Sequence, residues 1–358
     1  MGIKYLHKFL RDNSVNSIRL MHINQLRNKK IVVDINIYLY QYLAEDRLLE
    51  KTYMMLSLFK YYNIIPIFIF DGKPPLEKKY ELERRRLNKL QAKQDLKEAL
   101  YQLDNNNLEL QEKEELITKI EDLKYQSVFL SKKAIEDVKQ LIIAFGMTYY
   151  DALNEADELC ALLVLKNKVW ACMSDDSDML AYGCHRVLRY FDLMKQNVLY
   201  YDLNGILDEL GLTHEQLREI CVLSCNDYNI EYYEIPKKVI QENEENQENK
   251  YKSNNKYNPK QSKKLKNYGL YYVLKQFKYY KKSKSNLKFK DWLIENNKLL
   301  INNEAIETFN KINNIYQLKN QNIYNEIINL KIFNGFYNSE KIRSLMKNDG
   351  FIFRPSDI

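Results

Sequence analysis

Apolar runs and helix-spaced segments alternate in the first 75 residues. Ile31–Asp34 and Ile64–Asp71 are continuous apolar runs that end in an acid, a pattern typical of strands buried on both faces of a sheet. Residues 35–62 between them have helical spacing. The order predicts helix, strand, helix, strand, with the two strands parallel and joined by a crossover.

A long charged segment then replaces this pattern, from residue 76 to residue 140. It is rich in helix-favouring residues and is broken once, at Asp104–Asn107. We expect an antiparallel helical hairpin that stands off the sheet. The alternative is a surface coiled-coil hairpin without a ligand.

Residues 141–236 return to an α/β pattern. Asn154 is a candidate cap for the apolar helix that follows it. Val169–Asp178 is expected to be a buried strand that ends in acids, and His214–Tyr228 a helix that ends near Asp227.

Residues 237–298 have a different composition, and residues 299–358 are expected to be Asn-rich helices. Between Lys250 and Lys290 there are 14 Lys and 7 Tyr but no Asp or Glu. Lysines that neutralise phosphates and tyrosines that stack on bases suit a nucleic-acid surface. The alternative is a solvated, disordered insertion.

The composition narrows the class of protein. The chain has 358 residues, a formal charge of +7 and 45% hydrophobic residues, as expected of a folded protein. Ile64–Phe70, its longest apolar run, is too short to span a bilayer. A soluble, intracellular protein with no membrane partner is expected.

The cysteines and histidines do not indicate a zinc site or a disulfide framework, because they lack metal-ligand spacing and no CxxC occurs. Buried, reduced thiols are expected instead. The cysteines are Cys160, Cys172, Cys184, Cys221 and Cys225.

Acids stand where the predicted strands end. Asp34 ends the first strand and Asp71 the second, and Asp176 and Asp178 follow the third. Side chains at the carboxyl ends of parallel strands share one edge of the sheet, where ligands bind. If the third strand stays extended, Asp176 and Asp178 point to the same side.

Three more acids complete the set: Glu155, Asp157 and Asp227. Carboxylates crowded into one cleft require cations to offset their repulsion and desolvation. Oxygen ligands favour Mg²⁺ or Mn²⁺, and two such ions can promote phosphodiester hydrolysis. Each acid alone has a plain alternative, a common strand end or a solvated turn.

These motifs resemble the flap-endonuclease (XPG-like) structure-specific 5′ nucleases. The similar blocks are MGIKYL, VVDINIYLYQYL, IFIFDGKPPLEKKYELERRR, ALNEADELCALL, MSDDSDML and SCNDYN. The resemblance covers residues 1–75 and 125–230. It implies a PIN-like α/β fold with a mostly parallel sheet, helices on both faces, a helical arch and a C-terminal helical region that binds duplex.

The resemblance also implies roles for individual residues. Two Mg²⁺ ions, replaceable by Mn²⁺, would be held by Asp34, Asp71, Glu155, Asp157, Asp176, Asp178 and Asp227. Lys78 and Arg85 would act on the phosphate, Tyr40 would stack on a base, and Gly2 would let the amino end approach the site after removal of Met1. DNA contacts are also expected from Lys263, Lys264, Lys266 and Gly269.

The chain departs from the family pattern in four places. NIEYYEIPKKVI follows the last acid and lacks the glycine turn that holds K⁺ in the helix-two-turn-helix motif; Asn267–Leu270 is the nearest candidate. Met179 replaces a usual glycine, and Asp157 a usual Glu. The C-terminal residues show no sliding-clamp box, so clamp binding is not supported. Such erosion resembles homologues from large DNA viruses, and the resemblance leaves the nucleus and a cytoplasmic viral replication site open as compartments.

The predicted function is hydrolysis of DNA at 5′ flaps, gaps or ends by a monomeric, metal-dependent nuclease in replication, repair or recombination. The predicted regions are 1–75 and 141–236 for the nuclease, 76–140 for the arch, 237–298 for an insertion with a degenerate duplex-binding motif, and 299–358 for terminal helices. Two alternatives remain at this stage: a catalytically inactive junction-binding protein and an RNA 5′-3′ exonuclease.

Overall fold

A single mixed sheet of seven strands organises the part of the chain that the computed structural model describes, namely residues 2–75, 78–105, 109–224, 226–228, 269–300, 302–319, 325, 327 and 330–353. The strand order is β1-β7-β6-β5-β2-β3-β4. The strands are β1 (Ile18–His22), β2 (Lys30–Asp34), β3 (Ile65–Phe70), β4 (Thr148–Asp151), β5 (Ala171–Met173), β6 (Arg186–Asp192) and β7 (Asn197–Asp202).

The predicted α/β fold with a mostly parallel sheet is confirmed. Strands β6, β5, β2, β3 and β4 are all parallel to their neighbours in that order. The antiparallel part is one edge, where β7 pairs with β6 and β1 pairs with β7. The parallel strands therefore end together, at the edge where the sequence places its acids.

Apolar side chains on both faces of the sheet form two cores. Along β2, Val32 belongs to one core, and Ile31 and Val33 belong to the other, because successive side chains of a strand point to opposite faces. Helices α1 (Leu6–Asn13), α7 (Ala156–Leu165), α8 (Asp178–Tyr182), α9 (Leu203–Leu210) and α10 (His214–Leu223) pack into the first core, and α2 (Ile35–Ala44), α3 (Leu48–Tyr61) and α6 (Lys132–Ala144) into the second.

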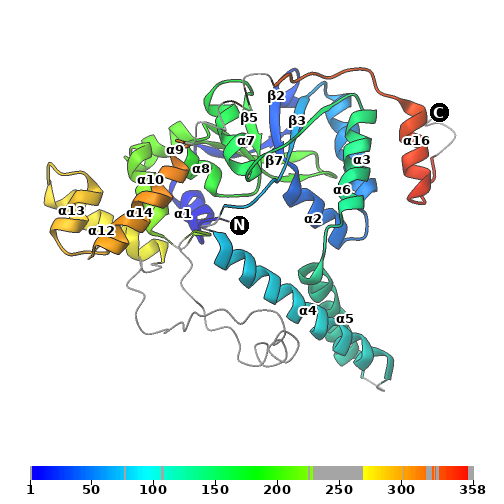
Figure 1. Cartoon of the computed structure of the whole chain (residues 1–358), viewed down its shortest axis with the longest axis horizontal. Helices are drawn as coiled ribbons and strands as arrows, with labels where there is room; N and C mark the ends of the chain where they lie inside the picture. The colour runs from blue at the N-terminus through cyan, green and yellow to red at the C-terminus, as the bar shows by residue number, and fades with distance from the viewer. Residues whose placement is uncertain are drawn as a thin grey trace, which may run out of the picture.

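The helical hairpin projects from this body (Figure 1). It consists of α4 (Lys79–Asn105) and α5 (Leu110–Ser127). The two helices pack on each other through a small core of their own, made of Ala92, Ala99, Ile120 and Leu123. The base of α4 lies against the body, because Lys78, immediately before α4, pairs with Glu155, and Arg85 in α4 pairs with Asp227.

C-terminal helices extend the body on two sides (Figure 1). Helices α12 (Leu270–Ser283), α13 (Phe289–Glu295) and α14 (Asn303–Tyr316) pack near α10 and contribute to the first core. Helix α16 (Ser339–Asn348) packs on α6 and contributes to the second. The C-terminal region is thus built onto the body on both faces of the sheet.

Three predictions near the acids are wrong, and one of them is the helix over His214–Tyr228, which ends at Leu223 as α10. Asn154 does not cap the helix after it; α7 begins after Glu155, and Asp71 accepts the hydrogen bond of its first amide, Ala156 N, at 2.9 Å. Nor is Val169–Asp178 one strand, since β5 ends at Met173 and α8 begins at Asp178. The expected extended geometry of Asp176 and Asp178 is therefore absent.

The prediction of a single helix over residues 35–62 is wrong, because that segment forms two helices, α2 and α3.

The remaining expectations concern the thiols and membrane spans. Cys160, Cys172, Cys184 and Cys221 are buried free thiols, while Cys225 lies outside the described residues. No helix within the described ranges combines the length and apolar character needed to cross a bilayer.

Candidate active site

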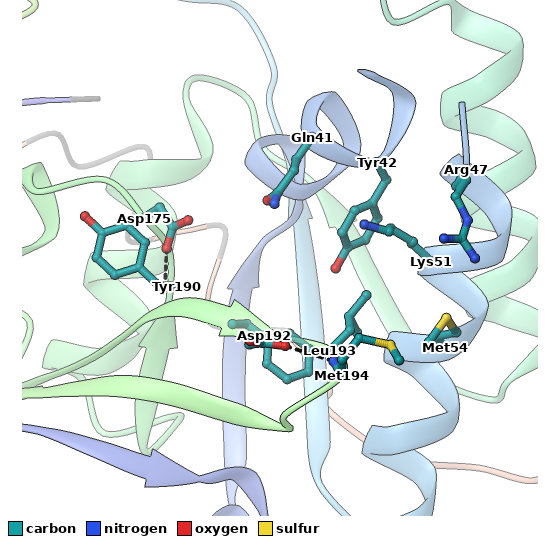
Figure 2. Close-up of a pocket in the computed structure, with 11 residues that line it drawn as sticks. Gln41, Tyr42, Arg47, Lys51, Met54, Asp175, Tyr190, Asp192, Leu193 and Met194 are labelled. Atoms are coloured by element: carbon teal, nitrogen blue, oxygen red, sulfur yellow. Dashed lines mark hydrogen bonds between the residues drawn. The ribbon is translucent and has the colours of Figure 1, made fainter. Parts of the chain in front are cut away.

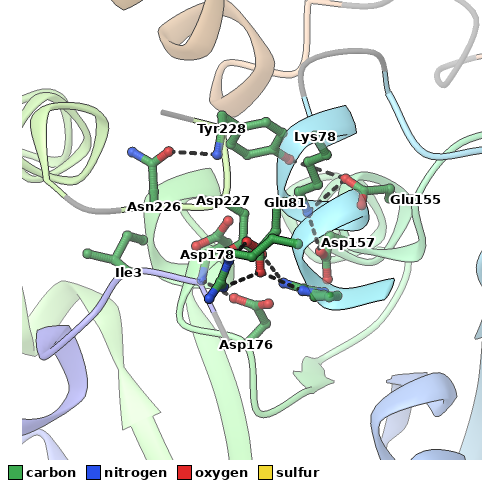
Figure 3. A network of polar contacts seen from close by, with 12 residues as sticks. Ile3, Lys78, Glu81, Glu155, Asp157, Asp176, Asp178, Asn226, Asp227 and Tyr228 are labelled. Carbon is green, nitrogen blue, oxygen red and sulfur yellow. Dashed lines mark hydrogen bonds and ion pairs between the residues drawn. The ribbon is translucent and has the colours of Figure 1, made fainter. Parts of the chain in front are cut away.

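The predicted acids converge at the carboxyl edge of the parallel strands. Asp34 closes β2 and Asp71 follows β3, while Asp176 lies in the turn after β5. Asp157 comes from the first turn of α7, and Asp227 follows α10. Figure 3 shows the carboxylates of Asp157, Asp176, Asp178 and Asp227 gathered around the base of α4.

Hydrogen bonds from neighbouring segments fix the acids of the two central strands. Ser174 Oγ donates to Asp34 Oδ2 at 2.9 Å, which connects the end of β2 with the turn after β5. The capping bond from Ala156 N to Asp71 Oδ1 connects the end of β3 with α7. Both acids are therefore held by partners more than 80 residues away in the sequence.

A tight turn arranges Asp176 and Asp178. Asp178 N donates to Asp176 Oδ1 at 2.8 Å, and Asp176 N donates to Ser174 Oγ at 3.1 Å. Asp178 Oδ2 accepts a hydrogen bond of 2.9 Å from the hydroxyl of Tyr316. The other oxygen, Oδ1, is buried and has no hydrogen-bond partner among the described residues.

Mutual repulsion and burial perturb these carboxylates. Burial raises the pKa of Asp34, Asp157 and Asp178 well above its ordinary value. Asp71 raises that of Asp34 further, and Asp176 raises that of Asp157 and Asp178. The acids therefore share one electrostatic environment that disfavours their charged forms and favours a cation.

Lys78 is one of two basic side chains that enter this environment from the hairpin. It is buried, and its Nζ lies 2.9 Å from Glu155 Oε2 and 3.9 Å from Asp157 Oδ2 (Figure 3). Burial lowers the pKa of Lys78, but Asp157 and Glu155 outweigh burial and raise it above its ordinary value. Lys78 is thus a charged ammonium group within the acidic site.

Arg85 is the second basic side chain. Its Nη2 donates to Asp227 Oδ2 at 2.6 Å, and its Nε donates to Glu81 Oε1 at 2.6 Å. Glu81 is buried and also accepts two hydrogen bonds from Arg84. The sequence reasoning missed Glu81, although its spacing of four residues from Arg85 on a helix is a signal for such a pair.

Gly2 lies against Asp176 and Asp178. It has φ +76°, and an added Cβ would overlap Oδ1 of Asp176 and of Asp178 and lie 2.6 Å from Ser177 Oγ. Ile3 N donates to Ser177 Oγ at 2.7 Å and fixes the approach. The amino-terminal segment therefore reaches the site at a position where only glycine fits.

Tyr40 and Gly269, two of the predicted DNA contacts, are found in different settings. Tyr40 is 41% exposed, and Lys89 Nζ from α4 lies 4.4 Å from its ring centroid. Gly269 is the N-cap of α12 with φ −63°, and nothing would lie within 4 Å of an added Cβ. Lys263, Lys264 and Lys266 lie outside the described residues, as do Asn267 and Tyr268.

Helix α12 adds a basic and aromatic surface to the body. Val273 and Phe277 point into the core, whereas the exposed side carries Lys and Tyr side chains. These exposed residues are Tyr271, Tyr272, Lys275, Lys278, Tyr279, Lys281 and Lys282. Such a face suits phosphate and base contacts.

The donor set fits divalent cations. Carboxylate oxygens are the ligands that Mg²⁺ prefers, and Asp178 Oδ1 is buried without a hydrogen-bond partner in the described part of the chain. Among the described residues, no three His, Cys, Asp or Glu side chains lie close enough together to hold a metal ion as they stand. Lys78 and Arg85 hold some of the carboxylates instead, so a cation would compete with these ion pairs.

A separate pocket of about 390 Å³ lies between α2, α3 and the β6–β7 hairpin (Figure 2). Arg47 and Lys51 line it, as do Met54, Leu193 and Asp175. Arg47 is paired with Glu50 and Lys51 with Glu45. Because its basic groups are already neutralised, this pocket offers no free charge for an anionic ligand.

Comparisons with known proteins agree with this arrangement. Residues 1–92 match the XPG N-terminal domain, and residues 146–227 match the XPG I-region. Among relatives, flap endonuclease 1 of Zea mays is 32% identical over 251 residues, which are 64% of this chain and 62% of that protein. Flap endonuclease 1 of Brugia malayi is 31% identical over 248 residues, with the same coverage. The chain thus spans about three fifths of the length of these relatives.

Solved structures show the same fold. The catalytic core of Rad2 superposes with a TM-score of 0.56 at 21% identity, covering 97% of this chain and 94% of that one. Human GEN1 in complex with Holliday junction DNA gives a TM-score of 0.51 at 15% identity, covering 98% of this chain and 73% of that one.

The sheet and the helical hairpin place the chain in the class of PIN-like 5′-nuclease folds, as the match to the catalytic core of Rad2 shows. The predicted resemblance is confirmed: two regions of the chain match XPG domains, and the chain is similar to flap endonucleases.

Proposed function

We propose that the protein is a structure-specific 5′ nuclease that hydrolyses DNA phosphodiesters with two divalent cations, Mg²⁺ or Mn²⁺. One observation carries this proposal: acids from separate strand ends and helices converge, and Lys78 and Arg85 reach them from the base of the helical hairpin. Such a site can hold both the cations and the phosphate on which they act.

The cations would be held by the acidic set, directly or through water. That set is Asp34, Asp71, Glu155, Asp157, Asp176, Asp178 and Asp227. When bound, the two ions would activate water and stabilise charge on the leaving oxygen. The chain's own contribution is to hold the carboxylates by the hydrogen bonds from Ser174, Ala156 N and Tyr316.

Lys78 and Arg85 would bind the phosphate. Both now pair with carboxylates, and a cation bound to those carboxylates would release the two side chains for the phosphate oxygens. A guanidinium and an ammonium group placed where negative charge develops stabilise the transition state. Their place at the hairpin base would couple DNA threaded against the hairpin to the reacting phosphate.

DNA itself would be held on both sides of the site. Tyr40 would stack on a base near the acids, after Lys89 leaves its ring. The exposed Lys and Tyr face of α12 would follow the duplex backbone. We propose a monomer that acts on 5′ flaps, gaps or ends, with the insertion and the terminal helices serving the duplex.

Substrate profiling of the purified protein tests the proposal. Labelled 5′-flap, gapped, nicked and blunt duplexes are incubated with and without Mg²⁺, and the same flap is made with an RNA strand. We expect Mg²⁺-dependent cleavage of DNA with a 5′ single strand. Tight junction binding without any cleavage would support an inactive binding protein, and faster cleavage of RNA would support an RNA exonuclease; either result would overturn the proposal.

Asp176→Ala provides the matched test of the site. We expect it to abolish cleavage while junction binding in the presence of Ca²⁺ is retained. The control is Asp208→Ala, which removes an exposed carboxylate on α9. Cleavage by Asp176→Ala at the wild-type rate would show that the acids do not form the active site.

A further inference from the structure

Tyr316 connects the C-terminal region to the acidic site. It is the last residue of α14, is fully buried, and donates its hydroxyl hydrogen bond to Asp178 Oδ2 at 2.9 Å. The two residues are 138 positions apart. Tyr316 also lies well beyond residue 227, where the matched XPG I-region ends.

Two other buried tyrosines hold the ring of Tyr316 in place. Its centroid lies 5.0 Å from that of Tyr182 and 5.6 Å from that of Tyr228, both in edge-on contact. The hydroxyls of Tyr182 and Tyr228 are 3.2 Å apart, and Tyr228 donates to Glu155 Oε2 at 3.3 Å. Tyr182, Tyr228 and Tyr316, here called the tyrosine cluster, therefore touch carboxylates on two sides of the site.

The hydrogen bond from Tyr316 determines how the Asp178 carboxylate is turned. Oδ2 is occupied by the hydroxyl, so the oxygen left for a cation is Oδ1, which is buried and accepts no hydrogen bond from any residue that the structure describes. Added atoms on Gly2 would meet this same Oδ1 and Oδ1 of Asp176, so the two oxygens face a common place. Partners that hydrogen-bond to a ligand's other atom commonly fix its orientation toward a metal.

We propose that Tyr316 is a positioning residue that fixes the Asp178 carboxylate with Oδ1 directed at a divalent cation. Helix α14 then contributes a residue to the proposed nuclease site in addition to packing into the first core. This inference rests on the proposed function, because it assigns Asp178 to a cation. It adds a residue from outside both matched domains to the cation site.

Cation binding without DNA provides the first readout. Tyr316→Phe keeps the ring and its packing and removes only the hydroxyl. We expect its dissociation constant for Mn²⁺, measured by calorimetry on the full chain, to rise about tenfold or more, and cleavage at low Mg²⁺ to fall but recover at high Mg²⁺. The control is Tyr38→Phe, because Tyr38 is equally buried and its hydroxyl has no hydrogen-bond partner among the described residues.

A double-mutant cycle provides the second readout. If the hydroxyl acts through Asp178, adding Tyr316→Phe to Asp178→Asn changes Mn²⁺ affinity no further. Wild-type Mn²⁺ affinity in a folded Tyr316→Phe protein, or equal effects of Tyr316→Phe in both backgrounds, would overturn the inference. A wild-type protein that neither binds Mn²⁺ nor cleaves DNA would instead overturn the proposed function.

Discussion

Arg85 Nη2 lies 2.6 Å from Asp227 Oδ2, so the helical hairpin and the segment after α10 meet in an ion pair inside the candidate active site. The two residues are 142 positions apart. Burial opposes the charge on Arg85, but Asp227 and Glu81 outweigh burial and raise its pKa. The guanidinium thus lies among acids whose negative charge a bound divalent cation would neutralise.

Removal of the two basic side chains at the hairpin base should lower the rate of cleavage more than the affinity for DNA. For Lys78→Ala with Arg85→Ala, we expect single-turnover cleavage of a 5′ flap to fall on the order of 10²-fold or more, because transition-state charge is no longer stabilised. The flap dissociation constant should change only a few-fold. Rapid-quench and binding assays measure the two quantities.

Arg84→Ala is the matched control for that variant. Arg84 also pairs with Glu81, but its side chain is more exposed and makes no hydrogen bond to Asp227. We expect near wild-type cleavage. Equal losses of rate and affinity in the Lys78/Arg85 variant would mean that these residues serve binding only.

Enlarging Gly2 should damage the site without unfolding the protein. In Gly2→Ala the new methyl group would collide with Asp176 Oδ1 and Asp178 Oδ1, and φ +76° is itself unfavourable for alanine. We expect cleavage to fall by at least tenfold while the melting temperature changes little. Gly350→Ala is the control, since its φ of +83° is also positive but nothing lies within 4 Å of an added Cβ; similar activity of the two variants would contradict the assignment.

Divalent cations should stabilise the fold. Buried acids whose pKa values are raised destabilise the folded state while they are charged, and a bound cation relieves this. A ligand at 100 times its dissociation constant adds about 2.7 kcal/mol. We expect a saturable rise in melting temperature with Mg²⁺, reversed by EDTA and strongly reduced in Asp178→Ala; a rise that persists in this variant would place the cation elsewhere.

Glu219 predicts a pH dependence of stability. Burial, aided by Glu215 and Asp291, raises its pKa from 4.5 to about 7, although Arg218 and Lys288 lower it. In the folded state the group therefore keeps its proton between pH 4.5 and 7, where the unfolded chain loses it. Its contribution to stability is fully present below pH 4.5 and is lost as the pH rises through 7.

Glu219→Gln should remove that dependence. At pH 8 we expect the variant to exceed the wild type in free energy of unfolding by on the order of 2 kcal/mol. At pH 4.5 the two should be nearly equal. Urea denaturation at both values measures the difference, and parallel stability curves for the two proteins would contradict the prediction.

The sequence predicts the central strands well because their pattern is local. Ile31–Asp34 and Ile64–Asp71 are continuous apolar runs, and both occur as parallel strands. The edge strand β1 was not predicted, because its residues are mostly exposed or half-buried. Its pairing with β7 depends on a partner about 180 residues away, which no local pattern reveals.

In the candidate site, too, some features can be predicted from the sequence and others cannot. Acid types and their order are visible in the sequence, so the set could be named in advance. The turn that places Asp178 at a helix start, the Glu81 bridge and the Tyr316 contact depend on tertiary packing. Long-range contacts of this kind leave no periodic signal, so they required the structure.

The separate small core of the α4–α5 hairpin has a thermodynamic consequence. Ala92, Ala99, Ile120 and Leu123 form an apolar cluster that is separate from the two cores of the sheet, so the outer hairpin can open as a cooperative unit of its own while the sheet stays folded. Amide hydrogens near its tip should exchange with solvent deuterium well before those of β2 and β3. Amide hydrogens at the base of α4, which the ion pairs of Lys78 and Arg85 hold in place, should exchange slowly, like those of β2 and β3.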